Sequence, residues 1–230
     1  MRAEKLVVVG GGDPLMGVLI AFTRTEQVLH DLDTSLAAVS TYNTAHPGDP
    51  LAVRLRIFGG FTAPDWAKVL GGAPLTGQTR LAGGTGTLGR WWGGDYRAAW
   101  AAFQHQLAAH YDTNPLVSEV AVSSRATLTS EPMIFALGPK TIPGLVAAGW
   151  TPAAEQACLQ GALGDYSGWQ HTALTFAINP YRSVANGKPV ADDTVSDALV
   201  AACAESASHG GPRCLPANHG LQDDSASNTV

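Results

Sequence analysis

The feature that most constrains the fold of this chain is a repeated alternation of short apolar segments with longer amphipathic ones. Apolar runs of strand length lie at residues 16–22, 51–58, 116–124, 172–178 and 213–219. Apolar side chains at helical spacing predict helices over residues 25–43, 63–67, 95–110, 142–148, 152–163 and 192–207. Strand followed by helix, repeated, is typical of a parallel sheet with helical crossovers. The sequence therefore predicts an α/β fold of about five βα units.

The connecting segments differ in length at the two ends of the predicted strands. Returns from helix to strand are short, at residues 111–115, 165–170 and 209–212. Exits from strand to helix are long, at residues 59–94, 125–140 and 179–191. One face of the sheet should therefore carry nearly all the loops, as the active-site face of a barrel enzyme does. We expect a single domain over residues 1–221, followed by a polar tail at 222–230.

Composition limits the classes of partner. The chain has 230 residues, of which 45% are hydrophobic and 14% charged, and these values fit an ordinary globular core. The formal net charge is −5 and the Lys and Arg residues are scattered, so we expect no nucleic-acid partner. No apolar stretch reaches membrane-spanning length, and Gly10 ends the N-terminal run before it resembles a signal peptide. We therefore expect no membrane partner; oligomeric state and localisation stay open.

Two short patterns bear on cofactors and metals. Gly10-Gly11-Gly12 follows an apolar run, but Asp13 and Pro14 stand where a dinucleotide-binding helix should begin. We therefore expect an irregular N-terminal segment and no cofactor, and keep a nucleotide-dependent enzyme as an alternative. The three cysteines form no CxxC pair, so no metal site is predicted. Cys203 and Cys214 could form a disulfide or remain two buried thiols.

Two arginines interrupt one predicted strand. In residues 51–58, Arg54 and Arg56 alternate with leucine, valine and isoleucine. Strands of parallel sheets are usually apolar on both faces, and an unpaired buried charge is costly. Either these arginines point into a polar site, or the strand is an edge strand with solvated arginines.

Polar side chains gather where predicted strands end. Glu131 follows the strand at 116–124, and the next two strands are followed by the pairs Asn179 with Tyr181 and Asn218 with His219. Trp66 and Trp92 lie in the long segment after the arginine-containing strand. Aromatic rings stack on the apolar faces of sugars, amides orient hydroxyl groups, and glycosidases use carboxyl groups at the scissile bond. The set indicates a carbohydrate ligand.

Several of these residues also carry a family resemblance. The segment Val53–Gly60 with Ala63-Pro64-Asp65-Trp66, the sequence Ser130-Glu131-Pro132 and the sequence Asn179-Pro180-Tyr181 resemble the TIM-barrel glycoside hydrolase superfamily, in particular its large clan of retaining enzymes. The resemblance extends diffusely from about residue 16 to residue 221. It implies a (β/α)8 TIM-barrel-like fold and hydrolysis of O-glycosidic bonds.

The same resemblance implies roles for individual residues. Glu131 would be the catalytic acid/base, while Arg54, Arg56, Trp66, Trp92, Asn179, Tyr181, Asn218 and His219 would bind substrate. A complete barrel typically needs about 250 residues, and no later strand end carries a carboxylate that could be the nucleophile. The barrel is therefore expected to be incomplete, as in a fragment or a non-catalytic relative. The alternative function is a carbohydrate-binding or structural module.

Overall fold

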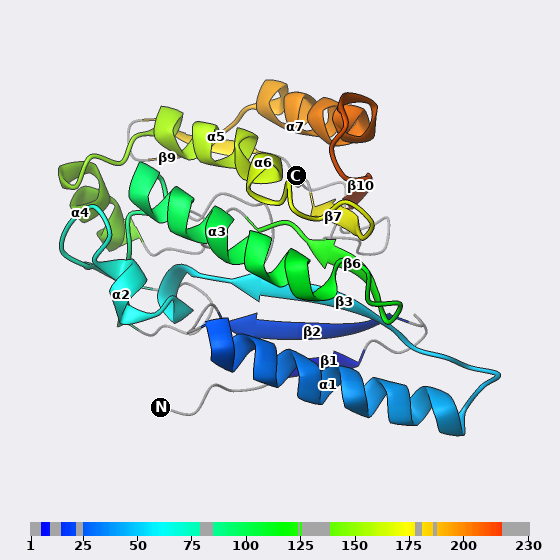
Figure 1. Cartoon of the computed structure of the whole chain (residues 1–230). Helices are drawn as coiled ribbons and strands as arrows, with labels where there is room; N and C mark the ends of the chain where they lie inside the picture. Colours follow the sequence, from blue (N-terminus) through cyan, green and yellow to red (C-terminus); the bar gives the residue numbers. More distant parts are fainter. Residues whose placement is uncertain are drawn as a thin grey trace, which may run out of the picture.

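A mixed α/β architecture is seen in a computed structural model of the chain, which describes residues 6–9, 15–21, 25–78, 85–123, 125, 139–177, 181–185 and 188–217 (Figure 1). The central sheet has the strand order β1-β2-β3-β6-β7-β10. Its strands are β1 (Leu6–Val9), β2 (Leu15–Ala21), β3 (Ala52–Phe58), β6 (Val117–Ala121), β7 (Ala173–Ala177) and β10 (Cys214–Ala217). β1 pairs with β2 antiparallel, and the pairs from β2 to β10 are all parallel. The predicted parallel sheet is thus confirmed.

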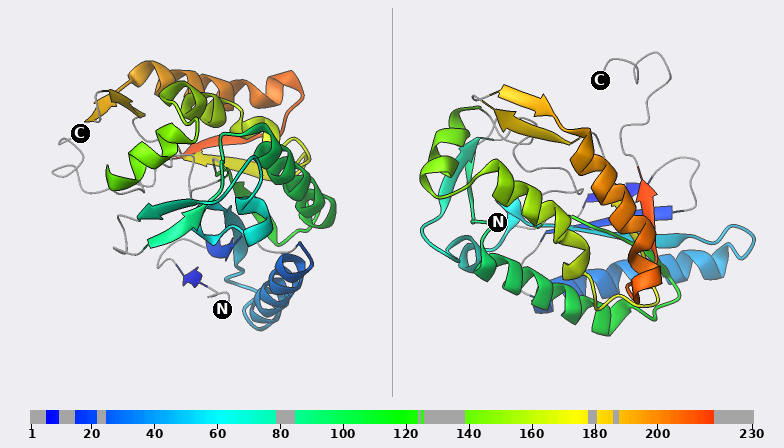
Figure 2. Two further views of the ribbon diagram at one scale, coloured as in Figure 1. Left: turned by 90° about the vertical axis from the view of Figure 1, so that its left-hand side faces the viewer. Right: turned by 90° about the horizontal axis from the view of Figure 1, so that it is seen from above.

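Helices follow the sheet along one side, as the two views of Figure 2 show. The α-helices are α1 (Thr25–Ala45), α2 (Asp65–Lys68), α3 (Gly94–Tyr111), α4 (Ile142–Ala147), α5 (Pro152–Gln160), α6 (Ala162–Asp165) and α7 (Asp193–Glu205). The 3-10 turns are at Gly60–Thr62, Pro139–Thr141 and Ser206–His209. Between β2 and β10 the strands stand side by side in chain order, but the described strands form an open sheet and do not close into a barrel.

The core lies between the sheet and these helices. In α1, Val28, Leu32, Leu36 and Val39 recur at helical spacing and are all buried. In β3, Val53, Leu55 and Ile57 alternate with the arginines and are also buried. Their burial follows the periods of 3.6 and 2 that the sequence displays. The apolar faces of α1 and β3 could therefore be predicted from the sequence.

The position of β3 decides between the two explanations of its arginines. It pairs with β2 on one side and β6 on the other, so it is an interior strand. The edge-strand alternative is therefore wrong. Arg54 and Arg56 lie on the face opposite Val53, Leu55 and Ile57, where both are only partly buried.

Three other expectations need correction. The N-terminal segment expected to be irregular contains β1, which pairs with β2. Two hairpins occupy segments expected to be loops: β4 (Leu75–Gln78) pairs with β5 (Thr85–Leu88), and β8 (Arg182–Ala185) pairs with β9 (Lys188–Ala191). These short strands were missed because their sequences are rich in Gly, Thr and small residues and show little hydrophobic alternation.

Two polar side chains fix the ends of helices to the starts of strands. Asn43, near the end of α1, accepts from the Leu51 amide and donates to its carbonyl, at 2.7 and 2.9 Å. Asp112, just after α3, accepts hydrogen bonds from the amides of Gln170, His171 and Thr172 ahead of β7. These amides lower the pKa of Asp112 although partial burial acts to raise it. The ends of α1 and α3 are thus tied by side-chain hydrogen bonds to the residues just before β3 and β7.

A disulfide joins α7 to the edge strand β10. It links Cys203 with Cys214, whereas Cys158 is a free, buried thiol. The disulfide alternative is therefore confirmed. Because β10 pairs on one side only, the bond ties an edge strand to the helix that covers it.

Reduction of this disulfide should lower the free energy of unfolding by about 3 kcal/mol, the loop-closure value for a separation of 11 residues. The measurement is urea unfolding with and without reductant, with the Cys203→Ser/Cys214→Ser variant in parallel. The variant should be unaffected by reductant. Equal midpoints for the oxidised and reduced wild-type protein would contradict the prediction.

Candidate functional site

The first candidate site is a polar cluster in the middle of the sheet, on the face opposite the helices. Arg54 of β3 donates from Nε to Oε2 of Glu119 in β6 at 2.6 Å. The Thr175 hydroxyl of β7 donates to the same oxygen at 2.6 Å. We call Arg54, Glu119 and Thr175 the sheet cluster. Three adjacent parallel strands thus contribute one polar side chain each, and the residues in register with Arg54 and Thr175 are Glu119 and Ala121 respectively.

The surroundings of Glu119 in the sheet cluster favour the ionised form of its carboxyl group. Burial acts to raise the pKa of Glu119, but the hydrogen bonds from Thr175 and Arg54 and the positive charges of Arg54 and Arg213 lower it overall. The side chains of Arg54 and Glu119 are 25% and 16% exposed, so the pair is neither fully solvated nor fully buried. Of the residues described, none donates to Glu119 Oε1. A carboxylate oxygen can accept a hydrogen bond from a ligand hydroxyl.

Acid should weaken the sheet cluster in a defined pH range. Because folding lowers the pKa of Glu119 from 4.5, the pair stabilises the fold fully above pH 4.5 and loses this contribution as the pH falls through the lowered value. The unfolding free energy of Glu119→Gln should therefore change less between pH 4.5 and 3 than that of the wild type. Because folding also lowers the pKa of Asp112, the unfolding free energy of both proteins should keep some dependence on pH. The measurement is chemical denaturation at a series of pH values. If the unfolding free energies of the two proteins changed equally with pH, the lowered pKa of Glu119 would be refuted.

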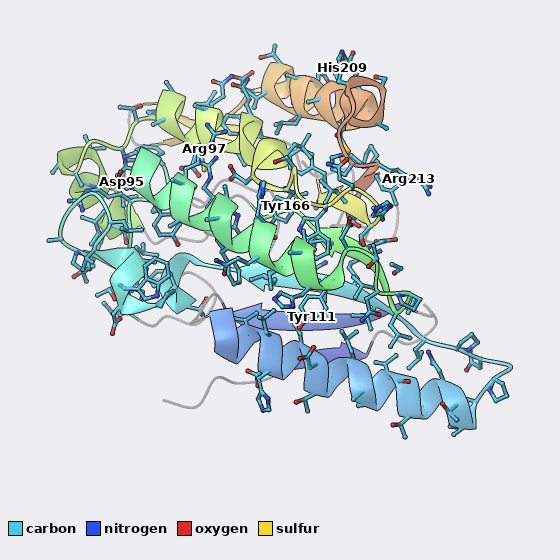
Figure 3. All side chains as sticks on the ribbon, in the orientation of Figure 1. Asp95, Arg97, Tyr111, Tyr166, His209 and Arg213 are labelled. Carbon is cyan, nitrogen blue, oxygen red and sulfur yellow. A yellow bond between two sulfur atoms is a disulfide. The ribbon has the colours of Figure 1, made fainter. Side chains whose placement is uncertain are left out.

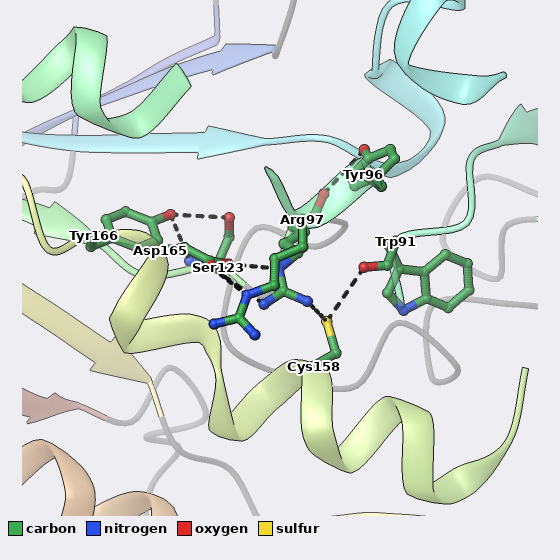
Figure 4. Close-up of polar contacts among 8 residues, drawn as sticks. Trp91, Tyr96, Arg97, Ser123, Cys158, Asp165 and Tyr166 are labelled. Atoms are coloured by element: carbon green, nitrogen blue, oxygen red, sulfur yellow. Dashed lines mark hydrogen bonds and ion pairs between the residues drawn. The ribbon is translucent and has the colours of Figure 1, made fainter. Parts of the chain in front are cut away.

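The second candidate site lies at the carboxyl end of β6, where the segment leading to Glu131 begins. Arg125 is only 2% exposed and donates from Nε and Nη2 to the two oxygens of Asp165, at 2.6 and 3.3 Å. Arg97 of α3 donates to Asp165 at 3.2 Å, and Arg125 Nη1 lies 3.2 Å from the Cys158 sulfur. We call Arg125, Asp165, Arg97 and Cys158 the Arg125 network (Figure 4).

The electrostatics of the Arg125 network rest on Asp165. Burial acts to lower the pKa of Arg125, but the Cys158 sulfur and the Asp165 carboxylate raise it overall. Burial raises the pKa of Cys158 to about 12, so this thiol is protonated at neutral pH. A protonated thiol carries no charge. Asp165 is therefore the group that compensates the buried guanidinium, and Cys158 is an unreactive thiol.

Arg125 has an unusual backbone conformation, and the contacts around it must stabilise that conformation. Its φ is +67°, and among the described residues it alone combines a side chain larger than glycine's with a positive φ. The Tyr96 hydroxyl donates to its carbonyl at 3.3 Å. A Cβ at Gly59 would lie 2.4 Å from that carbonyl oxygen, so the end of β3 needs glycine here. Left-handed backbone in such a residue costs about 1–2 kcal/mol, which the surrounding contacts must offset.

Ser123 completes this end of the sheet. Its hydroxyl donates to the Ile57 carbonyl at 2.9 Å, and its amide donates to the Tyr166 hydroxyl at 3.1 Å. Burial raises the pKa of Tyr166 to about 12, so the phenol stays neutral. The exits of β3 and β6 are thus joined to each other and to the turn after α6. These hydrogen bonds therefore hold in place the residues that precede the segment with Glu131.

Eight of the nine predicted site residues divide into three groups. Glu131, Asn179, Asn218 and His219 lie outside the described residues. Arg54 belongs to the sheet cluster, and Arg56 is half-buried on the same face. Trp66 on α2 is 46% exposed, and Trp92 is partly buried with its ring edge-to-face on Trp91, at a centroid distance of 4.8 Å.

Tyr181, the remaining predicted site residue, is buried. It is 3% exposed and belongs to the hydrophobic core, and its backbone amide donates to the Ser196 hydroxyl of α7 at 2.8 Å. The described contacts of Tyr181 are thus with the core and with α7, and its role in substrate binding stays a prediction.

Sequence reasoning missed Glu119, Thr175, Arg125 and Asp165. A signal existed for Glu119, because a lone acid in an apolar strand, one strand along from Arg54, fits the pairing that a buried arginine requires. Asp165 gave no signal, since it lies 40 residues from Arg125 in the sequence. Only packing brings these two together.

Two further findings concern the described residues. They contain no group of three or more His, Cys, Asp or Glu side chains placed to hold a metal ion. None of their helices is long and apolar enough to cross a bilayer.

Comparison of the chain with protein family models, with curated proteins and with solved structures gives no match.

Proposed function

We propose that the protein is a carbohydrate-active protein of the glycoside hydrolase type, with Glu131 as acid/base. The observation that carries the proposal is the sheet cluster. A sheet serving only as scaffold is expected to be apolar on both faces, because removing charges from water is costly. Here Arg54, Glu119 and Thr175 stand in its centre, on the face opposite the helices. Such groups suit recognition of ligand hydroxyls.

The strand arrangement supports the same proposal. In a (β/α)8 barrel, successive parallel strands are neighbours, the helices lie outside, and the active site lies at the carboxyl ends of the strands. From β2 to β10 the described strands are parallel neighbours in chain order. The retaining glycoside hydrolase clan is the family proposed for this chain, with the sheet as part of a TIM-barrel-like fold.

Roles follow from the chemistry of glycoside hydrolysis. Glu131 would donate its proton to the leaving oxygen, and Arg54 and Arg56 would orient the sugar. A general acid needs a raised pKa, which burial or a second carboxylate provides. Glu119, with its lowered pKa, does not meet that requirement and would act as a hydrogen-bond acceptor.

A non-catalytic carbohydrate-binding module is the second candidate. One observation favours it: Trp66 on α2 is 46% exposed. The exposed ring of Trp66 would serve such a module as a stacking surface.

The experiment is a panel of chromogenic glycosides assayed for hydrolysis, with calorimetric titration of matched oligosaccharides in parallel. Measurable hydrolysis of one class of glycoside supports the hydrolase. Binding without hydrolysis assigns the protein to the second candidate. Absence of both would refute a carbohydrate ligand altogether.

A further inference from the structure

The β10 edge of the central sheet has a short backbone attachment. β10 has four residues, Cys214–Ala217, and among the described strands it pairs only with β7. Pro216 lies within it and has no amide hydrogen to donate, as is usual for a proline in an edge strand. Segments with few attachments open locally at a lower free-energy cost than the interior of a sheet. A further attachment can therefore decide how often β10 opens.

The disulfide between Cys203 and Cys214 is that further attachment. Cys203 lies near the end of α7, on its buried side, and Cys214 is the first residue of β10. Between them the chain forms the largely exposed 3-10 turn Ser206–His209. Figure 3 labels His209 in this turn and Arg213 beside β10. The two cysteines themselves are only 1% and 9% exposed, so a reductant can reach their sulfurs only when this edge opens locally.

Opening of β10 would change the strand that carries part of the sheet cluster. Thr175, which donates to Glu119, lies on β7 in register with Leu215 of β10. β7 reads Ala-Leu-Thr-Phe-Ala, without a charge or a proline, so as an edge strand it would lack the residues that usually protect edges. The charge of Arg213, directly before β10, also contributes to the lowered pKa of Glu119. The state of β10 therefore bears on the sheet cluster as well as on the edge.

We propose that the Cys203–Cys214 disulfide is a redox-controlled latch, which holds β10 against β7 when oxidised and lets β10 open when a dithiol reduces it. One thiolate of the reductant attacks a disulfide sulfur, breaks the S–S bond and forms a mixed disulfide, and its second thiol then displaces the other cysteine. The protein gains two electrons and two protons as two thiols, and the reductant becomes a disulfide. The interior strands β2, β3 and β6 stay paired, because each has a neighbour on both sides.

The test is hydrogen exchange with mass spectrometry on the full chain, with and without dithiothreitol at neutral pH. Amides of residues 172–178 and 212–217 should exchange about 10- to 100-fold faster after reduction, up to the loop-closure contribution of the bond. The Leu174 amide, which donates to the Arg213 carbonyl at 2.7 Å, lies in this region. Amides of residues 51–58 in β3 should keep their exchange rates.

Two variants serve as controls for the reductant. Cys203→Ser/Cys214→Ser should exchange rapidly at both edge segments with or without dithiothreitol, because the latch is absent. Cys158→Ala removes the third cysteine of the chain and should respond to dithiothreitol as the wild type does, since Cys158 takes no part in the bond. Alkylation of the new thiols, measured as added mass, checks that reduction has occurred.

Each other outcome would overturn the latch. Unchanged exchange at both edge segments after complete reduction would show that the bond does not control β10. Equal acceleration at residues 51–58 would show that the whole sheet opens together. A bond that dithiothreitol leaves intact in the folded protein would show that the edge does not open enough for a reductant to enter. The experiment uses no glycan, so its failure is distinguishable from failure of the proposed function.

Discussion

Replacing Asp165 by alanine should destabilise the protein by about 3–5 kcal/mol, the cost of leaving a buried charge without its partner. Asp165 is 1% exposed, and it receives hydrogen bonds from Arg125 and Arg97. Arg97 can turn to solvent, because its side chain is 53% exposed. Arg125 cannot, because its side chain is only 2% exposed. The measurement is the free energy of unfolding in urea at neutral pH.

Two control variants separate the lost ion pair from other effects. Asp197 of α7 is exposed, so Asp197→Ala should change stability by no more than about 0.5 kcal/mol. The double variant Arg125→Met/Asp165→Leu removes both charges and should be less destabilised than Asp165→Ala alone, because no unpaired charge remains. If Asp165→Ala were as stable as Asp197→Ala, Asp165 would not be the compensating charge of the network.

Glu131→Gln should reduce hydrolysis of the preferred glycoside by about 100- to 10,000-fold, the contribution typical of a general acid. Glutamine has nearly the same shape but cannot give up a proton at neutral pH. Substrate affinity should therefore change much less than kcat. The measurement is kcat and KM on a glycoside that the panel identifies, with binding followed by calorimetry.

A matched control and a leaving-group series sharpen this prediction. Glu205 is exposed at the end of α7, so Glu205→Gln removes the same charge and should leave hydrolysis unchanged. Substrates with activated leaving groups need less protonation, so Glu131→Gln should lose less activity on them than on ordinary glycosides. A uniform loss across the series would show that Glu131 is not the acid, and full activity would remove it from the site.

The predictable part of the fold was the part encoded by local period. Val28, Leu32, Leu36 and Val39 recur as a helix requires, and Leu55 and Ile57 alternate as a strand requires, so elements and their buried faces could be read in advance. The hairpins β4–β5 and β8–β9 could not, because glycine and threonine give no such pattern. Their strands form through pairing with each other.

The candidate site shows the same division. The alternation in 51–58 indicated that Arg54 and Arg56 needed partners or a polar environment, but did not identify either. Glu119 became the partner of Arg54 only when β3 and β6 paired, 65 residues apart in sequence. The sequence by itself thus determined the longer helices and the strands β2, β3, β6, β7 and β10, and the apolar faces of α1 and β3, since these depend on neighbours a few residues away. Tertiary structure alone decided that Asp165 compensates Arg125, that Cys203 binds Cys214 and that Tyr181 is buried, because each depends on distant segments meeting in space.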